Sequence, residues 1–313
     1  MPSPEPRSIL PRSLGWGIGL AASTAVISGI AVYLNATAVK EFGDATLFTT
    51  LKNGVAAVLL TGLLVANPPA RRALRGLSRR QWLQLATIGL VGGGAAFLLF
   101  FNGLALASAP SAAFIHKTLF IWVAALAVPF LGERVGWPQV AALAMLFGSQ
   151  LLIAPMTGVS WGPGETLIAL ATGLWAIEVV VARRLLRDVP SSVGAAGRMG
   201  MGLVVLVAAV LVTGRGEAVT TLSTSQWLWV IGTGVLLTGY VATWYAALRR
   251  APATVVTAVL VAAAPVTAIL TAIGRGMVPI EPLAVGSTLA VIGAAAMAWA
   301  AILARRAAPV PSP

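Results

Sequence analysis

The sequence predicts an all-α integral membrane protein with ten transmembrane helices, arranged as two inverted five-helix repeats. Three observations lead to this prediction: an extreme composition, a series of ten apolar spans and a short motif that recurs in both halves of the chain. Hydrophobic residues make up 58% of the 313 residues and charged residues only 10%. A soluble globular protein carries about 25% charged residues, so this composition indicates a polytopic membrane protein.

Ten apolar stretches are long enough, or nearly so, to cross a hydrocarbon core of roughly 30 Å at about 1.5 Å per residue. They cover residues 14–37, 45–67, 82–106, 111–131, 138–156, 165–182, 193–213, 227–247, 253–273 and 283–304. We therefore divide the chain into a tail (1–13), a first repeat (14–156), a second repeat (157–304) and a second tail (305–313). No convincing signal-peptidase site follows the first span, so we expect it to be retained as a helix.

The distribution of Lys and Arg predicts that both termini are cytoplasmic. With the N-terminus inside, the cytoplasmic segments hold Arg7, Arg12, Arg71, Arg72, Arg75, Arg79, Arg80, Arg134, Arg183, Arg184, Arg187, Arg249, Arg250, Arg305 and Arg306. The outer segments hold only Lys40, Arg215 and Arg275. An excess of positive charge marks cytoplasmic loops. Because the arginine-, alanine- and glycine-rich composition is typical of GC-rich bacteria, we expect a bacterial inner membrane protein.

An internal repeat supports the division into two halves. Gln-Trp-Leu opens the third span at 81–83 and the eighth at 226–228, and an Ala-Pro pair follows each of these spans. The same alignment places Lys52 of span two almost opposite Arg198 of span seven. Five spans per half is an odd number, so the second half enters the membrane from the opposite side. Inverted repeats of this kind are typical of secondary transporters.

Composition also excludes several function classes. The chain has no cysteine, one histidine and nine acids, so we expect no disulfide, no metal site and no cofactor. The net charge of +12 comes from arginines in short loops, so we expect no nucleic-acid partner. The glycine run at 92–94 lies within a span and lacks the strand–turn–helix context of a phosphate-binding loop, so it predicts close helix packing. We expect no enzyme activity.

The sequence resembles the ten-helix EamA-type permeases of the drug/metabolite transporter superfamily. The resemblance rests on Phe-Leu-Gly-Glu-Arg at 130–134, Gly148, Leu-Trp-Ala at 174–176 and the Leu…Ala-Pro segments at 106–110 and 248–252. It implies that spans one to four and six to nine surround a central cavity, with spans five and ten at the periphery. It also implies export or exchange of small organic metabolites, often amino acids or related compounds.

The chain departs from the family pattern at three places. It has Lys52 where arginine is frequent, and it has no proline at 120–123 in span four, although the second half keeps Pro265. The Gly-Glu-Arg ending of span four has no counterpart after span nine, which ends Gly-Arg-Gly at 274–276.

Ionisable residues within spans are costly and rare, so each is a candidate for function. Lys117 is the first candidate for binding an anionic substrate group, and Lys52 lies at a similar depth in span two. An anion between the two lysines would relieve their repulsion. The alternatives are that each lysine reaches the membrane interface, or that Lys117 bonds to carbonyls freed by a helix break. His116 points about 100° away from Lys117 on a helix, and it would either couple transport to protons or bond to a neighbouring helix.

Glu178 is the only acid within the interior of a predicted span. Consecutive antiparallel helices would bring it level with Arg198, which predicts an ion pair. The pair could be static, could act as a cytoplasmic gate, or could contain a proton-carrying acid, and the sequence leaves these three roles open.

Other polar or aromatic side chains complete the predicted substrate site: Asn35, Asn102, Trp122, Tyr240 and Trp244. Tyr240 and Trp244 share a helical face and could stack on a substrate. The alternative for Trp244 and Tyr245 is anchoring at the membrane interface.

Taken together, these residues predict a secondary transporter that moves a small organic metabolite by alternating access without ATP hydrolysis. The expected partners are the small-molecule substrate and the lipid bilayer. The sequence leaves open whether a proton is the coupling ion and whether the chain forms a homodimer. The alternatives are a flippase for a lipid-linked substrate and a non-transporting membrane subunit. An intramembrane enzyme would need a convergent catalytic set that this chain lacks.

Overall fold

The computed structural model describes residues 11–107, 109–153, 161–274, 276 and 281–306. Throughout this part of the chain the regular elements are helices, which confirms the predicted all-α class. In the described residues, nine helical stretches, some of them made of two or three consecutive elements, are long and apolar enough to cross a membrane, and the shorter apolar helix α8 completes ten. Arg7, Arg275 and the end of the first predicted repeat at residue 156 lie outside the described residues, as does most of both predicted tails.

The helices follow the predicted spans closely. The first half of the chain contains α1 (Pro11–Phe42), α2 (Ala45–Ala66), α3 (Pro68–Arg75), α4 (Arg79–Thr87), η1 (Ile88–Ala95), α5 (Ala96–Leu106), α6 (Ala109–Lys117), α7 (Leu119–Leu131) and α8 (Trp137–Ile153). The second half contains α9 (Pro163–Leu185), α10 (Ser191–Val212), η2 (Arg215–Thr221), α11 (Thr224–Arg250), α12 (Ala253–Leu260), α13 (Ala263–Gly274) and α14 (Glu281–Arg306).

Two features at the helix ends differ from the prediction. Helix α1 continues to Phe42, so Lys40 lies in its last turn rather than in a loop. The segment after α2 forms the short helix α3 instead of a plain charged loop. Asn67 caps this helix by accepting a hydrogen bond from the Ala70 amide, and Pro68 takes a first-turn position where its missing N–H costs nothing.

The recurring Gln-Trp-Leu motif has a local structural cause. In both halves the glutamine is the third residue of a helix whose N-cap is a serine: Ser78 with Gln81 in α4, and Ser223 with Gln226 in α11. Each serine hydroxyl accepts a hydrogen bond from the backbone N–H of the glutamine, and each glutamine side-chain oxygen accepts one from the backbone N–H of the serine. This is a capping box, so the repeat preserves the same helix start in both halves.

Spans four and nine are each broken into two helices, which the apolar pattern did not predict. Span four changes from α6 to α7 at Thr118, where the Thr118 amide bonds to Ile115 instead of to the residue four positions back. Span nine changes from α12 to α13 in the same way at Val261 and Ala262. The two breaks occupy corresponding places in the two halves.

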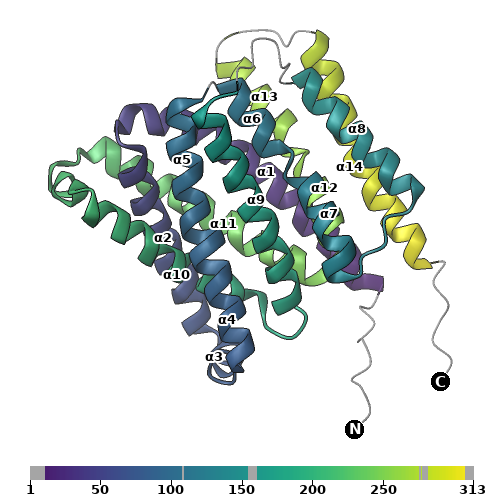
Figure 1. The fold of residues 1–313 in the computed structure, drawn as a ribbon, viewed down its shortest axis with the longest axis horizontal. Helices are drawn as coiled ribbons and strands as arrows, with labels where there is room; N and C mark the ends of the chain where they lie inside the picture. The colour runs from purple at the N-terminus through teal and green to yellow at the C-terminus, as the bar shows by residue number, and fades with distance from the viewer. Residues whose placement is uncertain (1–10, 108, 154–160, 275, 277–280, 307–313) are drawn as a thin grey trace.

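Spans five and ten lie at the periphery, as the family resemblance implied, while the implied central cavity stays a prediction. Helices α8 and α14 pack on each other at one edge of the molecule (Figure 1). In the remaining part, elements of the two halves alternate: α1 packs on α11, α12 and α13, while α9 packs on α5 and α7. Helix α10 lies between η1 and α2. The centre of the bundle is therefore formed by both halves.

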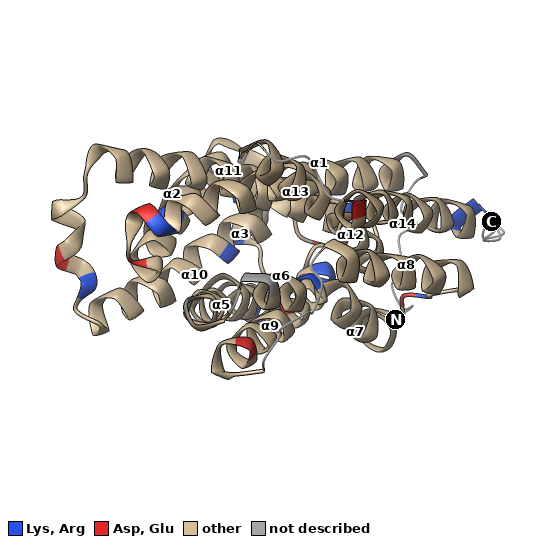
Figure 2. Ribbon diagram, turned by 90° about the horizontal axis from the view of Figure 1, so that it is seen from above, with Lys and Arg blue, Asp and Glu red and all other residues tan. Residues whose placement is uncertain are grey.

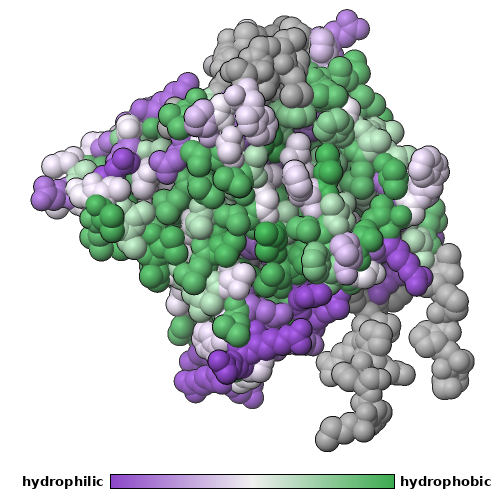
Figure 3. All heavy atoms as spheres, viewed as in Figure 1, coloured by the Kyte–Doolittle hydropathy of each residue, from purple (hydrophilic) through white to green (hydrophobic). Residues whose placement is uncertain are grey.

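The surface is that of a membrane protein. Hydrophobic residues cover most of the face seen in Figure 3, and hydrophilic residues follow its lower edge around α3 and α4. In the view from above, Lys, Arg, Asp and Glu occur at scattered places between long stretches of helix without charged residues (Figure 2). The beginning of α1 and the end of α14 lie toward this same lower side (Figure 1), which we call the termini face.

Glycines allow η1 and α10 to touch through their backbones. A Cβ on Gly202 would lie 2.4 Å from the carbonyl carbon of Gly93, and a Cβ on Gly93 would lie 2.2 Å from the carbonyl oxygen of Arg198. The predicted packing role of the glycine run at 92–94 is thus confirmed. Small residues that let backbones approach are typical of helix contacts in membranes.

We expect Gly202→Ala to destabilise the protein by about 1–3 kcal/mol, because the added methyl group has only immovable backbone to displace. The melting temperature in detergent would fall accordingly. Gly200→Ala is the matched control, since a Cβ on Gly200 of the same helix meets nothing within 4 Å. Equal melting temperatures for the two variants would contradict the close contact.

Candidate functional site

The centre of the bundle contains a buried ion pair between Glu178 of α9 and Arg198 of α10. The Arg198 Nε donates to Glu178 Oε1 at 2.9 Å, and Nη2 donates to Oε2 at 3.3 Å. The hydroxyl of Tyr245 from α11 donates to the same Oε1 at 2.6 Å. The two charged residues are only 2% and 6% exposed. The predicted pair is therefore present.

Helix η1 of the first half packs directly against this ion pair. The Gly92 carbonyl accepts bonds from Arg198 Nη2 at 3.3 Å and from Trp175 Nε1 at 3.0 Å. A Cβ on Gly92 would lie 2.3 Å from Glu178 Cγ, so only glycine allows the carboxylate to lie here. The pair thus joins α9, α10 and α11 to a helix of the other half. It is well bonded, and its predicted roles as static pair, gate or proton carrier remain hypotheses.

Lys52 of α2 lies in a different environment. Its ammonium donates to Asn35 Oδ1 of α1 at 2.9 Å, and it lies 5.1 Å and 4.9 Å from the ring centroids of Phe48 and Phe101. Lys52 is 4% exposed, and no acidic side chain of the described residues pairs with it. An ammonium has three N–H donors. In the described residues, one neutral acceptor and two aromatic rings are its partners.

A pair of stacked phenylalanines on α5 lies between the two cations. Phe97 and Phe101 stack with ring centroids 6.2 Å apart and planes within 8°. Lys52 lies over Phe101, and the guanidinium carbon of Arg198 lies 5.4 Å from the Phe97 centroid. One turn of α5 therefore brings the corresponding cations of both halves to one aromatic column.

His116 lies beside this column without a hydrogen bond among the described residues. Its ring packs 5.0 Å from Phe100 and 4.9 Å from Trp175, and its buried Nδ1 has no hydrogen-bond partner in the described part of the chain. The expected bond to a neighbouring helix is not formed there. A buried nitrogen with no bond indicates a position for water or a ligand.

Lys117 ends α6 at the break in span four and is only partly buried. No hydrogen bond or ion pair of its ammonium occurs within the described residues. Interrupted helices form the binding sites of many secondary transporters, so this position fits the predicted role. The structure shows no contact that joins Lys117 to Lys52, and a common cavity for the two stays a prediction.

Tyr240 and Trp244 stack on each other on α11, with ring centroids 6.1 Å apart. Trp244 is 4% exposed, and Tyr245 is fully buried. The alternative that Trp244 and Tyr245 anchor the protein at the membrane interface is therefore wrong, because neither ring reaches the surface. Their position near the end of α11 suggested the interface, and only the packing of α11 against other helices places them inside.

Two other predicted residues lie away from this group. Asn102 is exposed and donates to the Leu98 carbonyl of its own helix at 2.8 Å. Trp122 is 52% exposed and donates to the hydroxyl of Thr118, the N-cap residue of its own helix α7. The structure does not bring either side chain to Lys52 or to the ion pair.

Glu133 has a role that the sequence did not reveal. Its carboxylate accepts hydrogen bonds from the Ala253 amide at 2.6 Å, the Thr254 amide at 3.0 Å and the Thr254 hydroxyl at 2.8 Å. The loop after α7 therefore caps the N-terminus of α12, where the helix dipole favours an anion. The Leu-Gly-Glu-Arg motif was the signal, but the partner helix lies about 120 residues away in the chain.

Arginines of α9 strengthen the same contact at the termini face. Arg183 donates to the Leu248 and Arg249 carbonyls at the end of α11. Arg184 donates to the Phe130 carbonyl, and the residues after α9 add a bond from Arg187 to the Leu131 carbonyl at 3.0 Å. Helix α7 of the first half is thus fastened to the second half by Glu133, Arg184 and Arg187, and we call these contacts the termini-face seal. Arg183 joins α9 to α11 within the second half.

The opposite face has its own contacts between the halves. Arg215 pairs with Asp44 at 3.1 Å, and the Trp229 indole donates to Glu41 at 2.5 Å. The end of α1 and the turn before α2 are thereby joined to η2 and α11.

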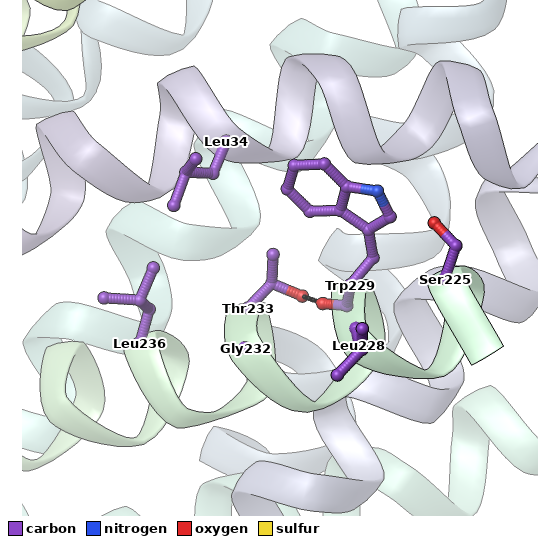
Figure 4. A pocket seen from close by; sticks show the side chains of 7 residues that line it. All are labelled: Leu34, Ser225, Leu228, Trp229, Gly232, Thr233 and Leu236. Carbon is purple, nitrogen blue, oxygen red and sulfur yellow. Dashed lines mark hydrogen bonds between the residues drawn. The ribbon is translucent and has the colours of Figure 1, made fainter.

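A shallow groove lies between α1 and α11, with a volume of about 510 Å³. Figure 4 shows the Trp229 indole reaching from α11 toward α1, near Leu34. The lining is almost wholly apolar and includes no charged residue and no predicted site residue. Among the described residues, no group of three or more His, Asp or Glu side chains lies close enough to hold a metal ion.

Comparison with known proteins shows what the chain is similar to. The model of the EamA-like transporter family matches residues 15–154 and again residues 162–300. A solved structure described only as "Crystal structure of protein" matches with a TM-score of 0.72 and 20% sequence identity, over 91% of this chain and 98% of that one. At this identity the likeness shows the fold alone. A comparison with proteins of curated function finds no match.

We expect Glu133→Ala to weaken the termini-face seal, because three charge-assisted bonds to α12 are lost, worth about 1.5–3 kcal/mol each. The melting temperature in detergent should fall by several degrees. Glu217→Ala is the control, since Glu217 is an exposed acid on η2. If the melting temperature of Glu133→Ala equals those of the control and of the parent protein, the cap contributes nothing to stability.

Proposed function

The chain belongs to the EamA-like transporter family, and from this membership we propose that it is a secondary transporter of a small organic metabolite, exported or exchanged by alternating access. The observation that supports a substrate site is Lys52, a buried cation with no acidic partner among the described residues. A carboxylate or another anion on the substrate would supply that partner. Aromatic rings on both sides of the ammonium would cover the rest of the molecule.

Lys117 is the second proposed cation of the site. It lies at the break of span four and is unpaired in the described residues, so a bound anion would stabilise it as well. Phe100 and Trp175 pack on the His116 ring, and Phe97 contacts Trp175, so that these three rings form an aromatic wall beside His116. We propose that Tyr240 and Trp244 extend this wall on the side of α11.

Alternating access requires that each end of the bundle can open while the other is closed. The termini-face seal would break when the site opens on that side, and the bonds of Asp44 and Glu41 would break when it opens on the other. Both sets join one half of the chain to the other. Rocking of the halves about a central site would therefore exchange one set for the other.

We propose that the termini face is cytoplasmic in a bacterial inner membrane. The arginines of α3 and α4 lie on this face, with those at the ends of α9, α11 and α14. Excess arginine next to spans marks the cytoplasmic side.

Proton coupling and dimerisation are further parts of the proposal. Glu178 and His116 are the candidates for carrying a proton, the first as the acid of a bonded pair and the second as a buried base with a free nitrogen. A homodimer would need an additional surface, which the lipid-facing helices could offer.

A flippase for a lipid-linked substrate is the competing function. It needs a lateral opening that accepts a charged headgroup, and the groove between α1 and α11 is the candidate for such an opening among the described residues. Its lining offers no charged group for a headgroup, so the geometry favours the metabolite transporter.

The transport proposal is tested by counterflow in proteoliposomes preloaded with a pooled mixture of amino acids and organic acids. We expect labelled solutes to enter with the parent protein, and Lys52→Ala or Lys117→Ala to lower the initial rate about tenfold or more, since a charge-assisted contact is worth about 1.5–3 kcal/mol. Lys40→Ala is the matched control, because Lys40 is exposed at the end of α1. Absence of uptake of any solute would contradict the proposal and favour the flippase.

Topology is tested with single cysteines, which are unique labels because the chain contains none. In intact cells we expect a membrane-impermeant maleimide to label Glu217→Cys on η2 and to leave Arg75→Cys on α3 unlabelled. Permeabilised cells should label both. The reverse pattern in intact cells would place the termini outside.

A further inference from the structure

The two halves of the chain place a cation in the same way. In each half, a basic residue of the second span is bonded to a polar residue of the first span. Lys52 of α2 donates to Asn35 of α1 at 2.9 Å, and Arg198 of α10 donates to Glu178 of α9, also at 2.9 Å. Each cation also lies over a phenylalanine of α5.

The two arrangements differ in charge. Glu178 neutralises Arg198, whereas Asn35 is neutral and leaves the charge of Lys52 uncompensated. The Asn35 amide is oriented for this contact: its Nδ2 donates to the Ala31 carbonyl at 2.6 Å, so its Oδ1 faces the ammonium. An asparagine thus faces the cation of the first half, whereas an acid faces the cation of the second half.

No other acid of the described residues can replace the missing counter-charge. Glu178 is used by Arg198 and Tyr245. The remaining described acids lie at helix ends and in loops: Glu41, Asp44, Glu133, Glu165, Asp188, Glu217 and Glu281. The side chains that face the Lys52 ammonium are Asn35 from α1, Phe48 from α2 and Phe101 from α5, all uncharged.

We propose that Asn35 is a specificity-determining residue, which keeps Lys52 without a counter-ion so that the transporter selects substrates with a net negative charge over zwitterions. This inference rests on the proposed function and narrows its substrate class to organic anions. A buried ammonium with an unpaired charge is costly, and a bound carboxylate removes that cost. A zwitterion brings an ammonium group as well, for which this environment offers no carboxylate.

The proposal is tested with probe pairs that share one carbon skeleton and differ only in the α-ammonium group. 3-Phenylpropionate and phenylalanine form one pair, and propionate and alanine form a smaller one. Initial uptake into proteoliposomes is measured for both members of each pair, with the uptake of protein-free liposomes subtracted. The parent protein should favour the anion of at least one pair.

Asn35→Asp should abolish that preference, because the new carboxylate occupies the ammonium of Lys52 as Glu178 occupies Arg198. We expect the anion-to-zwitterion ratio to fall about tenfold or more, which corresponds to about 1.4 kcal/mol. Asn35→Leu is the matched control of similar size. It removes the hydrogen bond without adding charge, so it should change rates but leave the ratio within about twofold of the parent value.

Binding to the purified protein in detergent gives a second readout that does not depend on transport. The anionic probes should raise the melting temperature of the parent protein and of Asn35→Leu, but not that of Asn35→Asp. A parent protein that prefers the zwitterions, or an Asn35→Asp ratio equal to that of the parent, would overturn the inference while leaving the transporter in place. Anion-induced stabilisation without any uptake would support the inference about binding and contradict transport.

Discussion

The fold depends on one buried carboxylate. Glu178 receives Arg198 from α10 and Tyr245 from α11, and it lies against the backbone of η1 at Gly92. Removal of one partner of a buried ion pair leaves an uncompensated charge and costs about 3–5 kcal/mol, so these elements must stay together. The glycines at 92, 93 and 202 follow from the same constraint, because any side chain there would separate η1 from the pair or from α10.

Lys52 shows what the same geometry does without an acid. It is bonded to the first span of its own half, as Arg198 is, and it lies on the same column of aromatic rings. Among the described residues its bonded partner is a neutral amide, which leaves its charge without a counter-ion there. The two cations therefore differ in the residue that faces each of them: an acid faces Arg198 and a neutral amide faces Lys52.

Several of the acids in the described part of the chain have structural roles. Glu133 caps α12, Asp44 caps α2 and pairs with Arg215, and Glu41 accepts from Trp229. Three of these contacts join the two halves at opposite ends of the bundle. Within the described residues, these carboxylates therefore hold the halves together, and none of them pairs with Lys52 or Lys117.

The sequence alone determined the membrane class, the ten spans and the recurring helix start, because these depend on local composition and on capping. It also predicted the ion pair of Glu178 and Arg198, since two consecutive antiparallel helices bring residues at equal distances from their connecting turn to the same depth. It could not predict the breaks at Thr118 and Val261, because an apolar run reads the same whether its backbone is continuous or interrupted. Nor could it separate buried Trp244 from exposed Trp122. Which face of a helix meets another helix is decided by packing between segments distant in the chain, and the same packing gave Lys52 its neutral partner and Glu133 its helix.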